Sequence, residues 1–508
     1  MIGNRPHAPV AFTALLFAFG AHGQPGSLDS TFDADGLRLF AASWGLRWFG
    51  ASALPDTSVV LCGEHWITPT SSEACFTHLL PDGSTDTDWG TNGYTYIDVG
   101  DDVRMYCIFH AGDGSYYAAG EYYDGSWPVD PDGILVHLLP DGTPDPAFGT
   151  AGAVIHEGIG IIFAMAPWGE DRMLFVGGSG LNDSHAWMMR CHTDGSLDTT
   201  FGTGGIVGDS ALSINLWDVD VLADGSIVGA GMWDQGIGFS QSMFVLVDSM
   251  GVPVPTFGIN GMLAGDAIAS GGKATGVVAA GTSFYAAGVT TVSSTTMDGY
   301  LAKVGNDGTL DPGFNGGAAV LIDRDTLDNI ESLIEDASGR ILVCGTAGPT
   351  VDVCAPMVAR YLPSGAADST FGTNGMTAVA VPGGFTTAME LLLAPDDKLL
   401  AAGYAGNTPL GIAFRLEGEG SLSAQQTEQA PVAFSVYPDP VADLVHLQLP
   451  PGWSERVHVR VMDATGHLVT AFDAQRHGPI DVSCLARGAY FLSVNDGAHR
   501  AVARFIAH

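Results

Sequence analysis

Apolar residues occur along the chain in short runs that are bounded by Gly, Asp, Asn, Ser and Pro, the residues typical of turns. Between Phe201 and Phe257, for example, these runs predict strands near 205–207, 216–222, 226–231 and 242–247. Residues 223–225, Ala-Asp-Gly, predict the hairpin turn between the second and third of these strands. No stretch of the sequence carries a convincing helical period. The pattern therefore predicts an all-β fold.

A short phrase recurs at a regular spacing through most of the chain. It reads PDGSTDTDWGTNG at 81–93, DGTPDPAFGTAG at 141–152 and DGSLDTTFGTGG at 194–205, and weaker copies lie at 26–36, 251–261, 307–317 and 365–375. The copies align on an aromatic residue, which is Phe32, Trp89, Phe148, Phe201, Phe257, Phe314 or Phe371. A second marker, a glycine that ends an apolar run in mid-unit, alternates with the first: Gly63, Gly120, Gly178, Gly231, Gly288, Gly345 and Gly403. Two markers in strict alternation indicate seven repeated units.

Seven units of four strands predict a seven-bladed β-propeller over residues 24–420. Each blade would pack on both neighbours, so its strands would be apolar on both faces, which agrees with an apolar content of 46%. The repeated aromatic residue is expected to fill the space between blades. Small residues before the mid-unit glycine would let the sheets approach closely near the hub. A β-solenoid is the rival architecture, but its coils are usually shorter than this repeat.

Basic and acidic residues recur together around the turn of the repeated phrase. The predicted pairs are His78 with Asp86, His137 with Asp145, Arg190 with Asp198, Lys303 with Asp311, and Arg360 with Asp368. In one copy both are lost together, as Leu246 and Val254. Their joint loss predicts that the two positions touch and clamp the turn, although Arg and Asp are also common in solvated loops. Asp29 in the first copy lacks a basic partner and Arg415 in the last lacks an acid, so we expect these two to meet where the ring closes.

The N-terminus predicts a signal peptide over residues 1–23. Arg5 precedes an apolar stretch at 10–20, and small residues follow at 21–23. The stretch is too short to cross a bilayer, and no other segment is apolar enough, so we expect an exported protein without a transmembrane anchor. The formal net charge of −37 argues against nucleic acid as a partner, because phosphate binding needs clustered Lys and Arg. We expect the mature protein to be a monomer.

The chain contains seven cysteines, an odd number that leaves at least one thiol unpaired. Cys62 and Cys75, and likewise Cys344 and Cys354, fall on neighbouring predicted strands of one hairpin. A disulfide in each hairpin and two buried thiols are both open interpretations.

The phrase DGSLDTTFGTGG, with Arg190 before it, resembles the delta-60 repeat of large exported bacterial proteins. The resemblance extends over about 26–420 and implies a propeller-like fold, but no catalytic residues. The copy at 251–261 departs from the repeat, because it lacks both the basic residue and the Asp.

The tail resembles a second family, the C-terminal sorting domain of the type IX secretion system. The resemblance spans 433–508 and rests on three ordered motifs, whose residues are Tyr437, Pro438, Asp439 and Pro440, then Gly466, then Leu485, Gly488 and Tyr490. Asp439 stands where the family usually has Asn. The resemblance implies a small β-sandwich that interacts with the type IX secretion machinery of Bacteroidota-type bacteria. The polar stretch 421–432 is the predicted linker, where cleavage could release the body.

No motif in the sequence identifies a reaction. HExxH, GxSxG and P-loop patterns do not occur, and the Asp-x-Asp-Gly stretches at 33–36 and 130–133 lack the spacing of a calcium loop. The sequence therefore assigns no catalytic, metal or cofactor-binding residue. It favours a secreted or cell-surface binding protein with a glycan or protein ligand. The alternatives are an extracellular hydrolase or lyase that acts on polysaccharide, and a purely structural surface protein.

Overall fold

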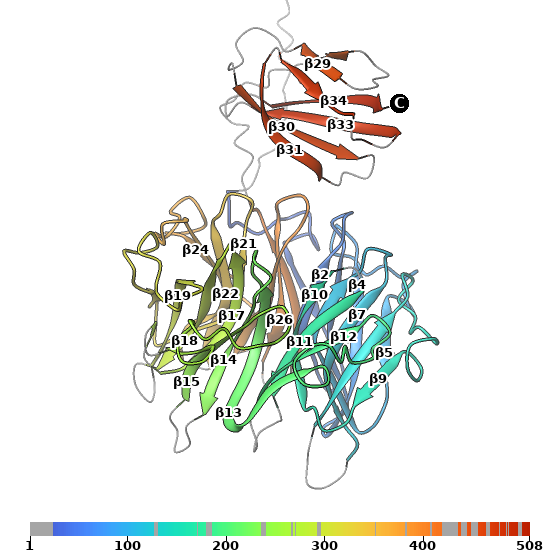
Figure 1. Ribbon diagram of the computed structural model, residues 1–508. Coiled ribbons are helices and arrows are strands. Elements are labelled where there is room, and N and C mark those ends of the chain that lie inside the picture. Colours follow the sequence, from blue (N-terminus) through green and yellow to red (C-terminus); the bar gives the residue numbers. More distant parts are fainter. Residues whose placement is uncertain are drawn as a thin grey trace, which may run out of the picture. The chain divides into compact units, whose positions relative to one another are not determined.

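A computed structural model describes residues 24–125, 131–169, 171–178, 185–234, 240–265, 268–269, 271–291, 296–350, 352–381, 384–406, 409–418, 435–437, 444–448, 456–463, 468–476, 478–483, 485, 487–495 and 500–507. The chain divides into two compact units, Met1–Gly420 and Ser421–His508. Both are built from antiparallel sheets, and the described residues contain no α-helix (Figure 1). The predicted all-β class is confirmed. The predicted signal peptide at 1–23 lies outside the described residues.

The described strands of the first unit form four sheets of four, seven, eight and eight strands. We divide them into seven antiparallel groups, at the single parallel bridges Ser72–Asp102 and Met297–Leu327 and within one long strand. The first group contains β2 (Leu46–Ala53), β3 (Val59–Thr68), β4 (Ser71–Leu79) and β5 (Tyr94–Ile97), and the second β6 (Asp102–His110), β7 (Tyr116–Tyr123), β8 (Asp132–Leu138) and β9 (Ala153–His156). The third and fourth contain β10 (Ile161–Trp168), β11 (Arg172–Gly178), β12 (His185–His192), β13 (Ile206–Val221), β14 (Ile227–Asp234), β15 (Ser240–Val247) and β16 (Met262–Ala264). The fifth contains β17 (Lys273–Ala280), β18 (Ser283–Thr291), β19 (Met297–Gly305) and β20 (Val320–Ile322), and the sixth β21 (Leu327–Glu335), β22 (Ile341–Thr350), β23 (Val353–Tyr361) and β24 (Met376–Ala378).

The last group joins the two ends of the first unit. It contains β25 (Thr386–Leu393), β26 (Leu399–Ala405) and β27 (Leu410–Leu416), and its fourth strand is β1 (Leu37–Phe40) from the beginning of the chain. Leu37 pairs with Phe414, and Phe40 pairs with Gly411. One sheet therefore contains strands from both ends of the repeat array.

The boundaries of the sequence repeats and the boundaries of the groups of strands differ by one strand. The strand that follows the repeated aromatic residue pairs with the preceding group, as Ile206 does with Met189 of β12. The strands predicted near 205–207 and 216–222 are one long strand, β13, whose first part completes the third group and whose second part begins the fourth.

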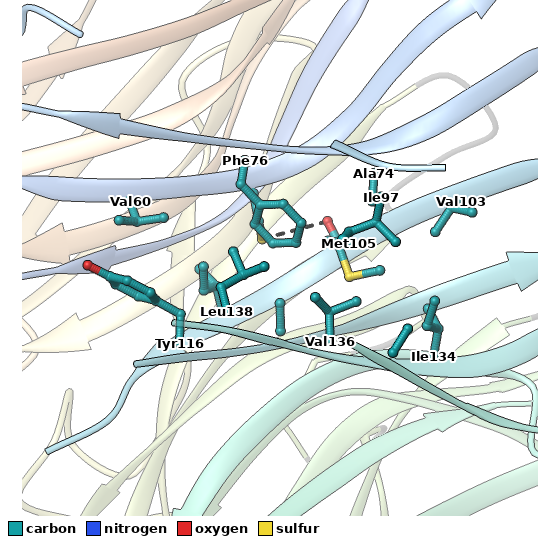
Figure 2. Packing of buried hydrophobic residues seen from close by; sticks show 14 of the residues in the cluster. Val60, Ala74, Phe76, Ile97, Val103, Met105, Tyr116, Ile134, Val136 and Leu138 are labelled. Atoms are coloured by element: carbon teal, nitrogen blue, oxygen red, sulfur yellow. Dashed lines mark hydrogen bonds between the residues drawn. The ribbon is translucent and has the colours of Figure 1, made fainter. Parts of the chain in front are cut away.

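Hydrophobic cores lie between successive groups of strands. Figure 2 shows the core between the first two groups, where Val60, Phe76 and Ile97 face residues of the second group such as Met105 and Val136. Similar buried clusters join each later group to the next, and one more joins the last group to the first. Complete burial of one such side chain stabilises the fold by about 1.5–3 kcal/mol, so contacts between groups are the main source of stability.

The repeated aromatic residues are all buried, with exposed fractions of 4% or less. Each lies close to the turn that begins the next copy of the phrase: the Cβ position of Gly142 would be 2.3 Å from the Trp89 ring, and that of Gly195 would be 3.0 Å from the Phe148 ring. Gly195 also has a positive φ of 83°, which favours glycine at this turn.

The structure gives no support to a disulfide in either predicted hairpin. Cys62, Cys75 and Cys344 are buried free thiols. Cys62 pairs with Phe76 and Cys75 pairs with Gly63, so the two sulfurs point to opposite faces of the sheet. Cys484 lies outside the described residues.

The second unit contains two antiparallel sheets. One has β28 (Ser435–Tyr437), β29 (Leu444–Gln448) and β32 (Pro479–Asp481), and the other has β30 (Arg456–Asp463), β31 (Leu468–Gln475), β33 (Gly488–Asn495) and β34 (Arg500–Ala507). Both sheets contribute to one core, in which Val445 and Ile480 pack with Val459 and Leu492. The alternation of apolar and polar residues in these strands places one face of each sheet against the other.

Candidate functional site

The first strand of each of the seven groups, with β13 taken for the fourth group and β25 for the last, contains an irregularity at the same place. The register between this strand and its neighbour skips one residue, a β-bulge. The skipped residues are Phe49, Tyr106, Phe163, Trp217, Thr275, Glu331 and Met389.

The mid-unit glycines accommodate these bulges. Gly63 pairs with Trp48, the residue before the skip, and a Cβ on Gly63 would lie 1.8 Å from the Arg47 carbonyl oxygen. Gly120 has the same relation to the Arg104 carbonyl oxygen, also at 1.8 Å. The close contacts of these glycines are therefore within one sheet, whereas small residues before them, such as Ala118 and Ala119, lie in the clusters between groups.

One glycine was assigned to the wrong position. In the third group the residue that pairs with Ile162, before the skip, is Gly177 and not Gly178.

All seven skipped residues line one cavity of about 510 Å³. This volume lies within the range of small-molecule sites, about 300–1,000 Å³. A hollow of about 690 Å³ also exists beside Arg324, Ala347 and Ala378, but none of its lining residues is aromatic. We therefore take the cavity at the bulges as the candidate site.

Aromatic side chains form a continuous arc along one side of this cavity. Phe49 lies 5.1 Å from Tyr106, Tyr106 lies 5.3 Å from Phe163, and Phe163 lies 6.2 Å from Trp217, between ring centroids. Tyr404 extends the arc at 6.2 Å from Phe49. These rings are only partly buried, in contrast to the aromatic residues of the repeated phrase. They therefore present ring surface to the cavity.

Polar side chains line the other side of the cavity. The Lys273 ammonium lies over the Trp217 ring at 5.5 Å and forms an ion pair with Glu331 at 3.6 Å. Ser332 donates a hydrogen bond to Glu390 at 3.3 Å. The cavity thus combines apolar ring surface with hydrogen-bonding groups.

Two carboxyl groups of the cavity have strongly raised pKa values. Burial raises the pKa of Asp218 to about 7, although its carboxylate accepts hydrogen bonds from the backbone N–H groups of Val277 and Val219. Burial also raises the pKa of Glu390 to about 8, and the charge of Asp218 raises it further. Near neutral pH both groups therefore hold protons for much of the time and can donate as well as accept hydrogen bonds.

A network of charged groups holds Tyr106 in place. Arg104 lies within 2.5 Å of Glu64, 2.6 Å of Glu121 and 2.8 Å of Asp102. The Tyr106 hydroxyl donates to Glu121 at 2.9 Å. Burial alone would lower the pKa of Arg104, but the neighbouring carboxylates outweigh it and raise the value. This network fixes one part of the aromatic arc.

The structure brings together the two residues of each predicted clamp pair. The nearest N···O distances are 2.9 Å for His78–Asp86 and for His137–Asp145, 2.8 Å for Arg190–Asp198 and for Arg360–Asp368, 3.5 Å for Lys303–Asp311, and 2.6 Å for Arg415–Asp29. Lys398 also reaches Asp29, at 2.7 Å, a contact that the sequence did not indicate.

The three arginine pairs are buried. Arg190 and Asp198 are each 2% exposed, and the Arg190 guanidinium lies 4.6 Å from the centre of the Phe201 ring. Arg190 also donates to the carbonyl of Ser249, in the turn of the next copy, at 2.7 Å. Burial would raise the pKa of Asp198, but hydrogen bonds from Thr200 and the charge of Arg190 lower it to about 2. These pairs therefore connect consecutive turns inside the protein.

Of the predicted sorting residues, Tyr437 ends β28, Gly488 begins β33, Leu485 packs against the core of the second unit, and Tyr490 lies in it. Pro438, Asp439, Pro440 and Gly466 lie outside the described residues.

The sequence analysis did not find the cavity. Its residues share no residue type, because Phe49, Thr275 and Glu331 occupy equivalent places. Only the spacing along the sequence could have located these residues. In six of the groups the skipped residue stands at a constant number of residues before the mid-unit glycine, and in the fifth group it is one residue closer.

Comparison with known families identifies the second unit. Residues 435–508 match the family described as secretion system C-terminal sorting domain. The match indicates export by the type IX secretion system and interaction with its machinery, and marks a secreted or cell-surface protein. No helix that could cross a membrane is found in the described part of the chain.

No curated protein matches the chain. Among solved structures, the extracellular domain of a protein described as a hybrid two-component system from B. thetaiotaomicron is similar over 93% of this chain and 57% of that one, with 6% identity and a TM-score of 0.38. A protein of unknown function from Dyadobacter fermentans is similar over 76% of this chain and 100% of its own, with 11% identity and a TM-score of 0.38. A glucose dehydrogenase is similar over 75% and 99%, with 8% identity and a TM-score of 0.35.

Proposed function

We propose that the seven groups of strands close into a seven-bladed β-propeller of delta-60-type repeats over residues 24–420. Two observations support closure. Buried clusters join every group to the next, including the last to the first, and β1 pairs with β27 beside the Arg415–Asp29 ion pair. In this arrangement the seven bulges surround the axis, and the cavity is the central channel. Residues 1–23 would be the signal peptide and 421–432 the linker to the sorting domain at 433–508.

This secreted or surface-attached propeller binds a glycan in its channel. The observation that carries the proposal is the arc of partly exposed rings, Phe49, Tyr106, Phe163 and Trp217, on a cavity of about 510 Å³. The C–H face of a sugar packs well against such rings, and its hydroxyl groups need donors and acceptors. Ser332, Glu390 and the Lys273–Glu331 pair supply these on the opposite side.

A glycan array followed by calorimetric titration of the full chain with the best hit tests this proposal. Trp217→Ala should weaken binding about two- to tenfold, because one aromatic contact contributes ~0.5–1.5 kcal/mol. Trp44→Ala is the matched control, since Trp44 is half exposed and does not line the cavity. Equal loss in both variants, or no hit on the array, would remove the support for a glycan ligand and favour a protein ligand or a structural role.

A second candidate is a polysaccharide hydrolase that uses the same cavity. Asp218 and Glu390 support it, because a carboxyl group that stays protonated near neutral pH can protonate a leaving group. Release of reducing sugar from a bound glycan, lost in Asp218→Asn and Glu390→Gln, would establish this activity. Tight binding without product would exclude it for that glycan.

A further inference from the structure

Three aspartates meet at the junction between the fifth and sixth groups of strands, away from the cavity. Asp298 is on β19, Asp323 follows β20, and Asp328 is on β21. Each offers one carboxylate oxygen, and these three oxygens lie within 4.8 Å of one another. The strands β19 and β21 touch here, where Met297 pairs with Leu327.

Two of these carboxylates are buried with an oxygen that has no partner. Asp298 is 7% exposed and Asp328 is 0% exposed, and Oδ1 of each accepts no hydrogen bond. Oδ2 of Asp328 accepts from the backbone N–H groups of Arg324 at 2.6 Å and Asp325 at 3.0 Å. The loop after β20 therefore donates to one oxygen of Asp328 and leaves the other without a partner.

Nothing in the described chain balances this charge. No Lys, Arg or His among the described residues forms an ion pair with any of the three aspartates. Burial raises the pKa of Asp298, and the charges of Asp323 and Asp328 raise it further. An unpaired buried carboxylate is strongly unfavourable unless a cation or a proton compensates it.

The repeat itself does not require a carboxylate at this place. Asp328 stands three residues before the skipped residue of its strand, and the other groups have Leu46, Val103, Gly160, Ile214, Gly272 and Thr386 there. An acid at this otherwise uncharged position, facing a second buried acid, indicates a specific role at this junction.

We propose that Asp298, Asp323 and Asp328 bind a divalent cation, with calcium as the preferred ion. Calcium takes carboxylate oxygens at about 2.3–2.6 Å, so two of its ligands can be up to ~5 Å apart, as these oxygens are. The smaller magnesium ion needs a tighter octahedral set. One calcium would neutralise two of the three charges and tie β19, the loop and β21 together. Extracellular sites of this kind have dissociation constants on the order of 10⁻⁴–10⁻³ M.

Calorimetric titration of the metal-free full chain with calcium chloride, repeated with magnesium chloride, tests the proposal. We expect one saturable calcium site, a rise in Tm with calcium that EDTA reverses, and weaker magnesium binding. Asp298→Asn and Asp328→Asn should each weaken calcium binding at least tenfold. Asp325→Asn is the matched control, because it removes one negative charge from the adjoining loop without removing a member of the cluster.

Folding is monitored separately, so that a loss of binding is not mistaken for unfolding. Both test variants should retain the wild-type Tm in EDTA or exceed it, because each removes a repulsive charge. The proposal is overturned if no saturable binding occurs up to about 10 mM of either metal, or if Asp298→Asn and Asp328→Asn bind calcium like the wild type. The first of these results would indicate that the buried pair shares a proton instead.

Discussion

Replacement of Gly120 by Ala tests the role of the mid-unit glycines. The added Cβ would lie 1.8 Å from the Arg104 carbonyl oxygen and 2.9 Å from Cα of Met105. Non-bonded atoms do not approach so closely, so the strand must move by more than 1 Å or lose its bulge. Either response breaks hydrogen bonds between β6 and β7 and shifts Tyr106 within the cavity.

The expected loss of stability is large for a single methyl group. Forced overpacking costs about 1–3 kcal/mol, and each ladder hydrogen bond contributes about 0.5–1.5 kcal/mol. We therefore expect Gly120→Ala to lower the free energy of unfolding by ~3–5 kcal/mol. Gly112→Ala is the matched control, since nothing lies within 4 Å of its Cβ position, and it should change stability by less than about 1 kcal/mol.

Urea denaturation followed by tryptophan fluorescence measures the difference, because all tryptophans except Trp453 belong to the first unit. The midpoint of Gly120→Ala should fall well below that of Gly112→Ala. Midpoints that agree within experimental error would show that the bulge yields easily, and would refute the explanation of the mid-unit glycine.

Three further outcomes are expected. Arg360→Met should destabilise the protein by ~3–5 kcal/mol because Asp368 is buried and loses its ion-pair partner. Lys303→Met, at a more exposed pair, should cost no more than about 1 kcal/mol; urea midpoints that fall equally would contradict this. The pKa of Asp218 is raised to about 7 in the folded state, so its contribution to stability is fully present below pH ~4 and is lost as the pH rises through 7. Asp218→Asn should therefore reduce the loss of stability between pH 5 and 8. An unchanged pH profile of the urea midpoint would count against the assigned burial. Deletion of 435–508 should retain the protein in the periplasm, as immunoblots of cell fractions would reveal; normal secretion of the truncated chain would refute the role of this domain.

The sequence by itself determined those features that depend on residues close to one another along the chain. Short apolar runs between turn residues determined the all-β class, and three ordered motifs determined the sorting domain at the C-terminus. Contacts across one turn, such as Arg190 with Asp198, join residues eight positions apart, so the repeated phrase places them together. What the sequence could not indicate is the burial of such a pair, because the Ser249 carbonyl that covers Arg190 belongs to the next copy.

Only the tertiary structure decided where side chains from different groups meet. Each strand that carries a bulge contributes its skipped residue to the cavity, although Phe49 and Glu331 have different side-chain chemistry. The aspartate cluster likewise joins Asp298 to Asp328 between the fifth and sixth groups of strands. A register slip of one residue changes the direction in which a side chain points, but it leaves the local apolar pattern of the sequence unchanged. The slip depends on hydrogen bonds to the neighbouring strand, which the local sequence does not show. For this reason the sequence specifies the strands and their order, while the assembled sheets specify the sites.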